Sequence, residues 1–263
     1  MQKRKLKVIS NEKEPSKGDE AHAHSHSDAD MGDDAYLKVL YALSKENEEL
    51  KSAFAKLFEQ TGQALMRTLE LRDPYTYGHS MRVMEYALLI GRGSALSQKE
   101  LKELELAAMF HDLGKIGVRD CVLLKEGPLN GKEAAAIRMH PNMGHEILSL
   151  IDAYKSIADG VLHHHERLDG KGYPSRLASE KIPLSSRIIL VADTFDAMTT
   201  TRPYRKLMPI ETAYKELEKY SGSQFDLEFV NVFLKEHSKL MTGKSAEGRI
   251  ISMPKRKSSK KAA

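Results

Sequence analysis

The sequence contains no tryptophan, and Cys121 is the only cysteine among its 263 residues. A single cysteine excludes a disulfide framework within the chain, which fits a reducing compartment. No apolar run reaches the roughly 18 residues of a transmembrane helix, and no signal-peptide core follows the basic N-terminus. Basic segments interleaved with aromatic residues, which are typical of nucleic-acid-binding modules, are missing as well. We therefore expect a cytoplasmic protein with no membrane span and no nucleic-acid partner.

Both ends of the sequence are polar. Residues 1–33 are rich in Lys, Glu, Ser, Gly and Asp and are predicted to be disordered. A flexible metal-binding tract is one interpretation of the alternating His22, His24 and His26 in this segment, but a solvated tract is favoured. Residues 241–263 form a basic tail, which we expect to be solvated. The whole chain is 41% hydrophobic and 30% charged, which suffices for one large domain or two small ones.

Residues 34–64 are predicted to form a helix with a coiled-coil pattern and N-terminal caps at residues 33–34. Successive d positions of the heptad repeat carry leucine: Leu43, Leu50 and Leu57. Asn47 occupies an a position, which favours a parallel pair of helices, and Glu46 and Lys51 have the g–e spacing of an ion pair between partners. The repeat covers only about three heptads. A homodimer through this helix and a stripe packed on the chain's own core therefore both remain open.

Residues 65–240 are predicted to form one helical domain without strands. Gly62 is expected to loosen the first helix and Pro74 to end it, because the residue before a proline avoids the α region. Ser97 and Asn130 each precede a glutamate by three positions, which is the capping-box signature of a helix start. In the first half of the domain, helices are expected from His79 through Ile90, from Ser97 to Asp112 and from Asn130 to His140. Residues 143–162 are expected to form two stretches, of which the second carries His163, His164 and His165. Further helices are expected from Pro183–Ser186 past Asp193, over 209–220 and over 226–240.

An imidazole and a carboxylate, His111 and Asp112, stand side by side at the predicted end of a helix, followed by Gly114 and Lys115. Such a pair can bind one metal, or its aspartate can bridge two, and Lys115 is then placed to meet an anion. On its own, the pair is more typical of a solvated helix end. Further His and Asp residues lie at predicted helix ends or loop borders, and with the pair they form a set of seven: His79, His111, Asp112, His140, His164, His165 and Asp193.

This set of five histidines and two aspartates exceeds what one metal ion takes. Two octahedral metals bridged by one carboxylate can use all seven side chains and keep positions for water and a substrate oxygen. Nitrogen and oxygen ligands together favour Fe, Mn, Co, Ni or Zn over Ca or Mg, and the absence of cysteine from the set excludes a structural zinc–thiolate site.

The order of these residues and of the loops between them resembles the HD-GYP subfamily of HD-domain phosphohydrolases, over about residues 65–240. The segments that carry the resemblance are Arg72-Asp73-Pro74-Tyr75-Thr76-Tyr77-Gly78-His79-Ser80, His111-Asp112-Leu113-Gly114-Lys115-Ile116-Gly117, His140-Pro141, His164-His165-Glu166, Asp169-Gly170-Lys171-Gly172-Tyr173-Pro174, Val191-Ala192-Asp193 and Arg202-Pro203-Tyr204-Arg205. The resemblance implies an all-α fold, an HD-domain helical bundle with a GYP loop, here preceded by a long N-terminal helix. No receiver-domain pattern precedes it.

The resemblance also implies how the metal ligands divide. One ion is expected on His79, His111, Asp112 and Asp193. Asp112 bridges to a second ion, which is expected on His140, His164 and His165. Two divalent transition ions are expected, Fe or Mn by preference, with Ni, Co or Zn also fitting. Some relatives bind a third ion through a glutamate four residues before the first histidine; Tyr75 occupies that position here and argues against a third ion.

The activity implied by the resemblance is hydrolysis of cyclic di-GMP to pGpG by a metal-bridged hydroxide in bacterial second-messenger signalling, and a second round that gives GMP is left open. Asp112 and Lys115 are the expected catalytic residues. Substrate contacts are expected from Lys115, Tyr173, Arg202 and Arg205, with Asp73 and Asp196 as lesser candidates. The alternatives are a non-hydrolysing cyclic-dinucleotide sensor or scaffold module and an HD phosphohydrolase that acts on another cyclic dinucleotide, such as cyclic GMP-AMP.

Overall fold

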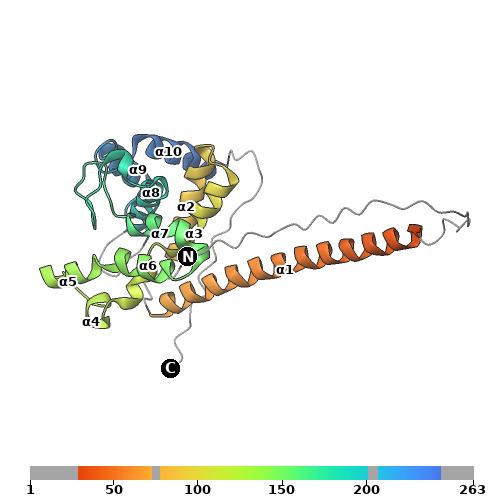
Figure 1. Cartoon of the computed structure of the whole chain (residues 1–263). Helices are drawn as coiled ribbons and strands as arrows, with labels where there is room; N and C mark the ends of the chain where they lie inside the picture. Colours follow the sequence, from red (N-terminus) through yellow and green to blue (C-terminus); the bar gives the residue numbers. More distant parts are fainter. Residues whose placement is uncertain (1–28, 73–77, 201–206, 244–263) are drawn as a thin grey trace, which may run out of the picture. The chain divides into compact units, whose positions relative to one another are not determined.

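The computed structural model describes residues 29–72, 78–200 and 207–243, and the elements within them are α-helices and short 3-10 helices. The predicted all-α fold is confirmed (Figure 1). The chain divides into two compact units at Glu59–Gln60. Most of the segment predicted to be disordered and most of the basic tail lie outside the described residues. None of the described helices combines the length and the apolar character that a membrane crossing requires.

Helix α1 (Ala29–Arg72) is continuous, and it starts a few residues before the predicted cap. The prediction that Gly62 loosens this helix is wrong. A Cβ atom at Gly62 would lie 2.8 Å from the ring of Phe110, so the glycine serves a close approach of the two residues within the second unit. The helix ends at Arg72, as the proline two residues later predicts.

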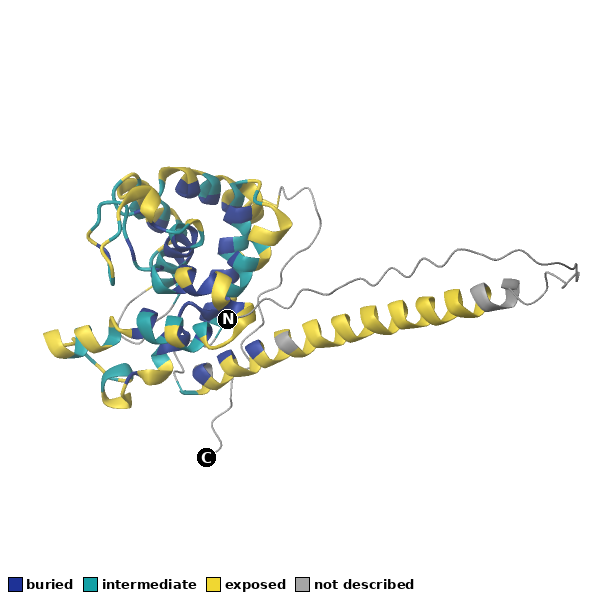
Figure 2. Ribbon diagram, in the orientation of Figure 1, coloured by how far each residue is buried: buried dark blue, intermediate teal, exposed yellow. Residues whose placement is uncertain are grey.

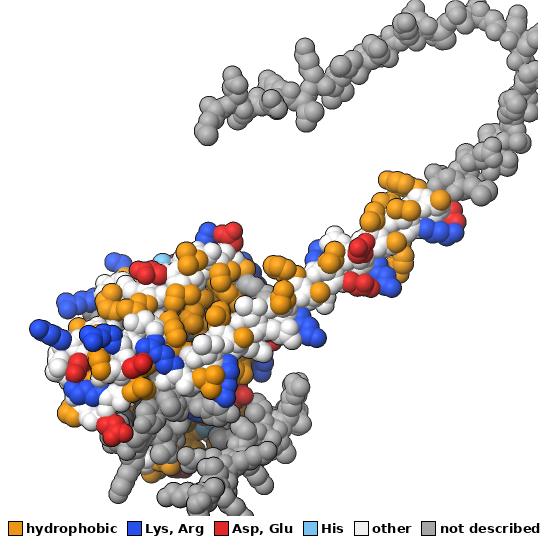
Figure 3. All heavy atoms as spheres, turned by 90° about the horizontal axis from the view of Figure 1, so that it is seen from below, with side chains coloured by type: hydrophobic (Ala, Val, Ile, Leu, Met, Phe, Trp, Pro, Cys, Tyr) orange, Lys and Arg blue, Asp and Glu red, His pale blue; other side chains and the backbone are white. Residues whose placement is uncertain are grey.

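The apolar heptad positions of α1 are exposed (Figure 2). Leu43, Leu50 and Leu57 keep 56%, 63% and 62% of their surface, and Phe54 keeps 68%. Apolar side chains follow the helix beside charged ones in the space-filling view (Figure 3). This part of α1 therefore presents the stripe that the heptad pattern predicts.

The second unit is a bundle of short helices around one apolar core. Helices α2 (His79–Gly93), α3 (Gln98–Phe110) and α8 (Leu184–Thr199) pack on one another, and α7 (Lys155–Leu162) packs on α3 and α8. Helix α10 (Leu227–Met241) covers α2. The remaining helices are α4 (Asp120–Leu123), α5 (Gly131–Ile137), α6 (His140–Ser149) and α9 (Ile210–Lys219), with the 3-10 helices η1 (Leu113–Gly117), η2 (Asp152–Tyr154) and η3 (Ser179–Lys181).

Both predicted capping boxes form. The Ser97 hydroxyl accepts from the Glu100 backbone N–H and the Asn130 carbonyl oxygen from that of Glu133, while each glutamate accepts in return from the backbone of the cap. One boundary is wrong: the helix after Asn130 ends at Ile137, and His140 begins α6 instead. Pro141 at the start of α6 explains the difference, because proline lacks only a backbone N–H that a first turn leaves unbonded.

A second boundary differs after α7. The three consecutive histidines 163–165 follow this helix, which ends at Leu162, and do not belong to it. The predicted break between the two stretches of 143–162 is confirmed, because α6 ends at Ser149 and α7 starts at Lys155. Except for Asp193, which lies within α8, the metal-ligand candidates thus lie at or next to helix starts and ends, where side chains from different helices converge.

Candidate metal centre

Three of the predicted ligands come together from three helices. His79 starts α2, His111 directly follows α3, and Asp193 lies in α8; one ligand atom from each lies within 4.8 Å of the other two. The two imidazole rings meet edge to face, with 5.3 Å between their centroids. We refer to His79, His111 and Asp193 as the carboxylate cluster.

A second group of three contains only histidines. His140 starts α6, and His164 and His165 follow α7; their ligand atoms also lie within 4.8 Å of one another. His140 and His164 are buried, and their Nε2 atoms approach to 3.2 Å. We refer to His140, His164 and His165 as the imidazole cluster.

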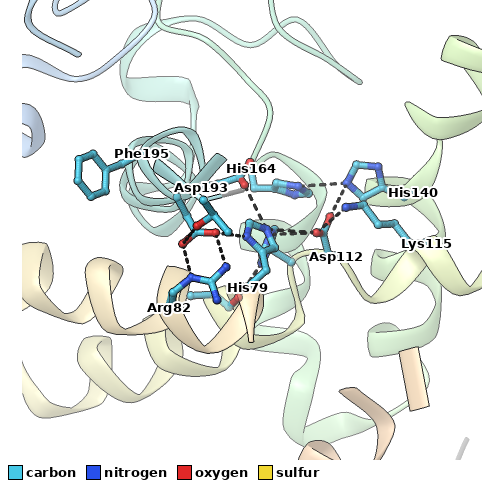
Figure 4. A network of polar contacts seen from close by, with 12 residues as sticks. His79, Arg82, Asp112, Lys115, His140, His164, Asp193 and Phe195 are labelled. Atoms are coloured by element: carbon cyan, nitrogen blue, oxygen red, sulfur yellow. Dashed lines mark hydrogen bonds and ion pairs between the residues drawn. The ribbon is translucent and has the colours of Figure 1, made fainter. Parts of the chain in front are cut away.

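Asp112 lies between the two clusters, and its side chain is almost fully buried (Figure 4). Its Oδ2 atom is 3.5 Å from Nε2 of His79 and 3.4 Å from Nε2 of His111. Its Oδ1 atom is 3.4 Å from Nε2 of His140. One oxygen of the carboxylate thus faces each cluster, which is the arrangement that a bridging ligand requires.

The hydrogen bonds of the ring Nδ1 atoms orient three of the histidines. Nδ1 of His111, His140 and His164 each lies 2.6–2.7 Å from the carbonyl oxygen three residues earlier in the chain. A carbonyl only accepts, so Nδ1 carries the proton and Nε2 keeps its lone pair for a metal. The donor atoms of both clusters are therefore prepared in the chemical form that binds a cation.

Two observations test whether these residues fit divalent ions. The Nε2 atoms of His140 and His164 face each other as lone pairs at 3.2 Å, an arrangement that a shared cation stabilises. Nε2 of His111 is buried and has no hydrogen-bond partner among the described residues. An unpaired buried nitrogen costs about 1–3 kcal/mol, which metal coordination would remove. The residues fit one ion in each cluster.

His79 is oriented by a carboxylate instead of a backbone carbonyl. Its Nδ1 donates to Oδ2 of Asp196 at 2.7 Å, and Arg82 donates to both oxygens of the same carboxylate at 2.6 and 3.0 Å (Figure 4). Asp196 is almost completely buried, and it does not line the cavity described below. The structure therefore places this predicted substrate-contact candidate behind a metal-ligand candidate, where carboxylates commonly fix the ring of a coordinating histidine.

The two clusters differ in the ionisation of their side chains. Burial favours a lower pKa for His79, but hydrogen bonds to Asp112, Asp193 and Asp196 outweigh it and hold that pKa well above the usual value. Burial favours a higher pKa for Asp193 in turn, but the hydrogen bond and charge of His79 lower it. Asp193 of the carboxylate cluster thus stays ionised at neutral pH.

In the imidazole cluster, burial governs the protonation. It lowers the pKa of His140, lowers that of His164 well below the usual value, and lowers that of His165 to about 3. Repulsion from His165, whose ring lies 4.1 Å away, adds to the effect on His164, and repulsion from His140 adds to the effect on His165. All three are neutral at physiological pH and ready to coordinate.

Lys115 lies one turn of η1 beyond Asp112. Its ammonium group is 2.7 Å from Oδ2 of Asp112. Burial favours a higher pKa for Asp112, but the positive charge of Lys115 beside it holds that pKa well below the usual range. Lys115 therefore stands at the predicted bridging carboxylate, with a positive charge that an anionic ligand can share.

Two glycines permit the close packing of the site. A Cβ atom at Gly114 would overlap the carbonyl oxygen of His140, so only glycine lets η1 lie against the start of α6. A Cβ atom at Gly172 would come within 2.6 Å of backbone atoms of residues 165–167. The Gly-Tyr-Pro loop thus lies directly on the backbone that carries His165, and Tyr173 donates its N–H to the His165 carbonyl oxygen at 3.3 Å.

Beside the clusters opens a cavity of about 730 Å³. Tyr173 lines it and stacks on the ring of His165 with centroids 4.7 Å apart. Among the described residues, four cationic side chains line the cavity against the single carboxylate of Asp193: Arg138, Arg167, Lys171 and Arg176. None of these four was among the predicted site residues, although Lys171 lies inside the Gly-Tyr-Pro motif and Arg138 only two residues before His140.

The structure brings all seven predicted metal ligands and Lys115 together, and it places Tyr173 at their edge. Asp73, Arg202 and Arg205, which were predicted to contact substrate, lie outside the described residues, and so does Tyr75. The assignment of Arg202 and Arg205 stays a prediction.

A family model described as an HD domain matches residues 63–229. The chain belongs to the HD-domain family. Among its curated relatives, the cyclic di-GMP phosphodiesterase of Thermotoga maritima is 38% identical over 75% of this chain and 54% of its own length. The cyclic di-GMP phosphodiesterase response regulator RpfG of Xanthomonas campestris is 39% identical over 69% of this chain and 48% of its own. These relatives confirm the HD-GYP resemblance.

The 3′3′-cGAMP-specific phosphodiesterase 3 of Vibrio cholerae is 37% identical over 74% of this chain and 38% of its own length. The HD chain thus spans about half or less of the curated relatives it matches. Solved structures share the fold. A cyclic GMP-AMP-specific phosphodiesterase of V. cholerae matches with a TM-score of 0.55 and 24% identity, over 71% of this chain and 50% of that one. The HD domain of the Listeria monocytogenes phosphodiesterase PgpH matches with a TM-score of 0.51 and 16% identity, over 68% of this chain and 97% of that one.

Proposed function

We propose that this HD-domain protein is a metal-dependent phosphodiesterase that hydrolyses cyclic di-GMP to pGpG, and further to GMP, in bacterial second-messenger signalling in the cytoplasm. One observation carries the proposal: the carboxylate of Asp112 turns one oxygen toward each of two ligand clusters. The cationic cavity beside them suits a phosphodiester substrate. The names of the relatives in T. maritima and X. campestris support the choice of cyclic di-GMP.

Two divalent transition ions, Fe or Mn by preference and Ni, Co or Zn as alternatives, would be held by the seven ligands, with Asp112 shared. When bound, such ions make water a nucleophile at neutral pH and attract phosphoryl oxygens. The protein supplies neutral imidazoles, whose low pKa in the imidazole cluster removes competition from protons. It also buries five of the seven ligands and half-buries His165 and Asp193, and low exposure to water strengthens the attraction between charges.

Lys115, in contact with Asp112, is assigned to the scissile phosphate, where its charge opposes the negative charge that develops during hydrolysis. Tyr173 is assigned to the substrate at the cavity wall. Arg202 and Arg205 keep their assignment as phosphate-binding residues, with Asp73 as a lesser candidate, on the strength of the motif alone. Asp196 is reassigned from substrate contact to the orientation of His79, because it is buried behind that ring.

The decisive test is hydrolysis of cyclic di-GMP by protein purified and loaded with Mn²⁺ or Fe²⁺ without oxygen, with products separated by chromatography. The parent should form pGpG. Asp112→Asn should lower kcat by at least about 1,000-fold, because both clusters lose a charged ligand. Asp152→Asn removes a carboxylate that is 94% exposed and should leave turnover unchanged. Turnover in Asp112→Asn near that of the parent would contradict the mechanism.

Cyclic GMP-AMP is the second candidate substrate, since three V. cholerae relatives carry that specificity in their names. Parallel assays with both dinucleotides separate the candidates: a higher kcat/KM for cyclic GMP-AMP would replace the proposed substrate. The non-hydrolysing sensor makes a different prediction. It would bind a cyclic dinucleotide in calorimetry without converting it, even with both metals bound.

We also propose a homodimer through a parallel coiled coil of α1. The exposed leucines at the d positions of residues 34–64 and Asn47 at an a position support it. Sedimentation should show a dimer that becomes a monomer when Leu43, Leu50 and Leu57 are replaced by Ala. Replacing Lys45 and Ser52, at outward f positions, should leave the dimer intact. A parent that sediments as a monomer would contradict this part of the proposal.

A further inference from the structure

Arg138 is the residue between α5 and α6, two positions before the metal-ligand candidate His140. Its side chain lines the 730 Å³ cavity, and its guanidinium carbon lies 5.6 Å from the centre of the Tyr173 ring. That ring in turn stacks on His165. One aromatic ring thus connects the guanidinium to the imidazole cluster, and the cation–π contact holds the charge in place at the cavity wall.

Of the four cationic residues that line the cavity, Arg138 and Arg176 have no carboxylate partner among the described residues, and Arg138 also lies over the Tyr173 ring. Arg167 donates to both oxygens of Asp169 and to Gln224, and Lys171 lies 4.0 Å from the same aspartate. Lys115, which does not line the cavity, is paired with Asp112. Over residues 29–72, 78–200 and 207–243, no carboxylate pairs with Arg138. An anion in the cavity would therefore find the Arg138 guanidinium without having to displace an ion pair.

A cyclic dinucleotide has two phosphodiesters in one ring. When one of them is bound at the two clusters, the other is carried into the adjoining cavity, with its own negative charge. The only carboxylate that lines this cavity in the described chain is Asp193, which belongs to the carboxylate cluster. We propose that Arg138 binds this second, non-scissile phosphate; the inference rests on the proposed function and names the group that the cavity recognises.

The chemistry of the guanidinium suits that role. Two parallel N–H donors match two phosphate oxygens, and Arg keeps its charge at every physiological pH. A charge-assisted contact of this kind contributes to affinity by about 10- to 100-fold. Arg138 contacts no scissile bond in this arrangement, so its loss weakens binding of substrates with two phosphates and leaves the chemical step intact.

The test compares Arg138→Gln with the parent on two substrates. With cyclic di-GMP, KM should rise by about 10- to 100-fold while kcat stays within about twofold. With bis(p-nitrophenyl) phosphate, which has one phosphodiester and no second phosphate, kcat/KM should stay within about twofold. Arg92→Gln, which removes an exposed arginine at the end of α2 that does not line the cavity, should match the parent on both.

Three results would overturn the inference. An equal loss on both substrates would mean that Arg138 acts by positioning His140. No loss on either would mean that it does not touch the ligand. A loss with cyclic di-GMP that is absent with cyclic di-AMP, which has the same two phosphates, would assign Arg138 to the guanine base.

The failure of the proposed function has a different signature. A parent that cleaves bis(p-nitrophenyl) phosphate but not cyclic di-GMP would contradict the proposed substrate. Calorimetry on metal-stripped protein then decides about Arg138 separately, because the Kd for cyclic di-GMP should still be about 10- to 100-fold weaker in Arg138→Gln than in the parent. An unchanged Kd would overturn the inference.

Discussion

The two ligand clusters that meet at Asp112 are built from similar residues but differ in charge. The carboxylate cluster of His79, His111 and Asp193 contains an ionised aspartate, and its His79 has a raised pKa. In the imidazole cluster, burial lowers the pKa of every histidine. A cation entering the first cluster displaces a proton from His79, whereas one entering the second meets donors that are already neutral.

The groups that orient the histidine rings also differ between the two clusters. Backbone carbonyls orient His140 and His164, so their ring orientation depends only on the helix ends that carry them. His79 depends on Asp196, a side chain that Arg82 also holds. Removing one side chain can therefore disturb the carboxylate cluster from behind, and no such substitution exists for those two histidines. The protonation and orientation of the ligands are therefore set separately in the two ion sites, although the sites share one carboxylate.

Removing one ligand from either cluster should have the largest effect on metal binding and turnover. His164→Gln and His111→Gln should each lower the metal content from two ions per chain to one, and kcat for cyclic di-GMP should fall by about 100-fold or more. Plasma mass spectrometry and product chromatography give both values. His145→Gln, on the outer part of α6 beside Asp159, is the matched control. A variant that keeps two ions would show that the missing histidine is not a ligand.

Asp196→Asn should affect the carboxylate cluster alone. The amide keeps the shape but loses the charge that orients His79 and pairs with Arg82, so the affinity for one of the two ions should weaken by about 10- to 100-fold. Competition with a chelator measures the two affinities one after the other. Asp196 would have no orienting role if both ions were released at the same chelator concentration as from the parent.

The unfolding free energy of the metal-free protein should depend on pH because the histidines of the imidazole cluster have lowered pKa values. His165 has a folded pKa of about 3 against about 6.5 unfolded, so the unfolded chain takes up a proton that the folded chain refuses. Stability contributed by neutral His165 is therefore present above its unfolded pKa and is lost as the pH falls toward the folded one. Between pH 7 and pH 5 this amounts to about 2 kcal/mol of unfolding free energy.

His140 and His164 shift in the same direction, whereas His79, with a raised pKa, keeps its full contribution below its unfolded pKa and loses it only as the pH rises through the folded one. Urea unfolding of metal-free parent and His165→Gln at both pH values isolates the effect of His165. The parent should lose more stability than the variant on acidification. Equal losses would contradict a neutral His165 in the folded protein.

Much of the fold and of the metal centre was predictable because helix ends leave local signals. The capping boxes at Ser97 and Asn130 form as predicted, and the seven ligands converge. His140 was assigned to the wrong helix because the preference of proline for a first helical turn was not applied to Pro141.

What the sequence could not reveal depends on contacts between distant segments. The packing of Gly62 against Phe110 and the place of Asp196 behind His79 arise only when separate helices meet. Arg138 carries no pattern that separates it from other exposed arginines. Only the fold shows that it faces Tyr173 in the cavity.

The most direct test of the two-cluster account is a titration of metal-free protein with Mn²⁺ or Fe²⁺ without oxygen, in which bound ions and cyclic di-GMP hydrolysis are measured on the same samples. The account predicts two ions per chain, with hydrolysis to pGpG appearing only as the second equivalent binds. Full activity at one ion per chain, or no activity with two ions bound, would contradict it.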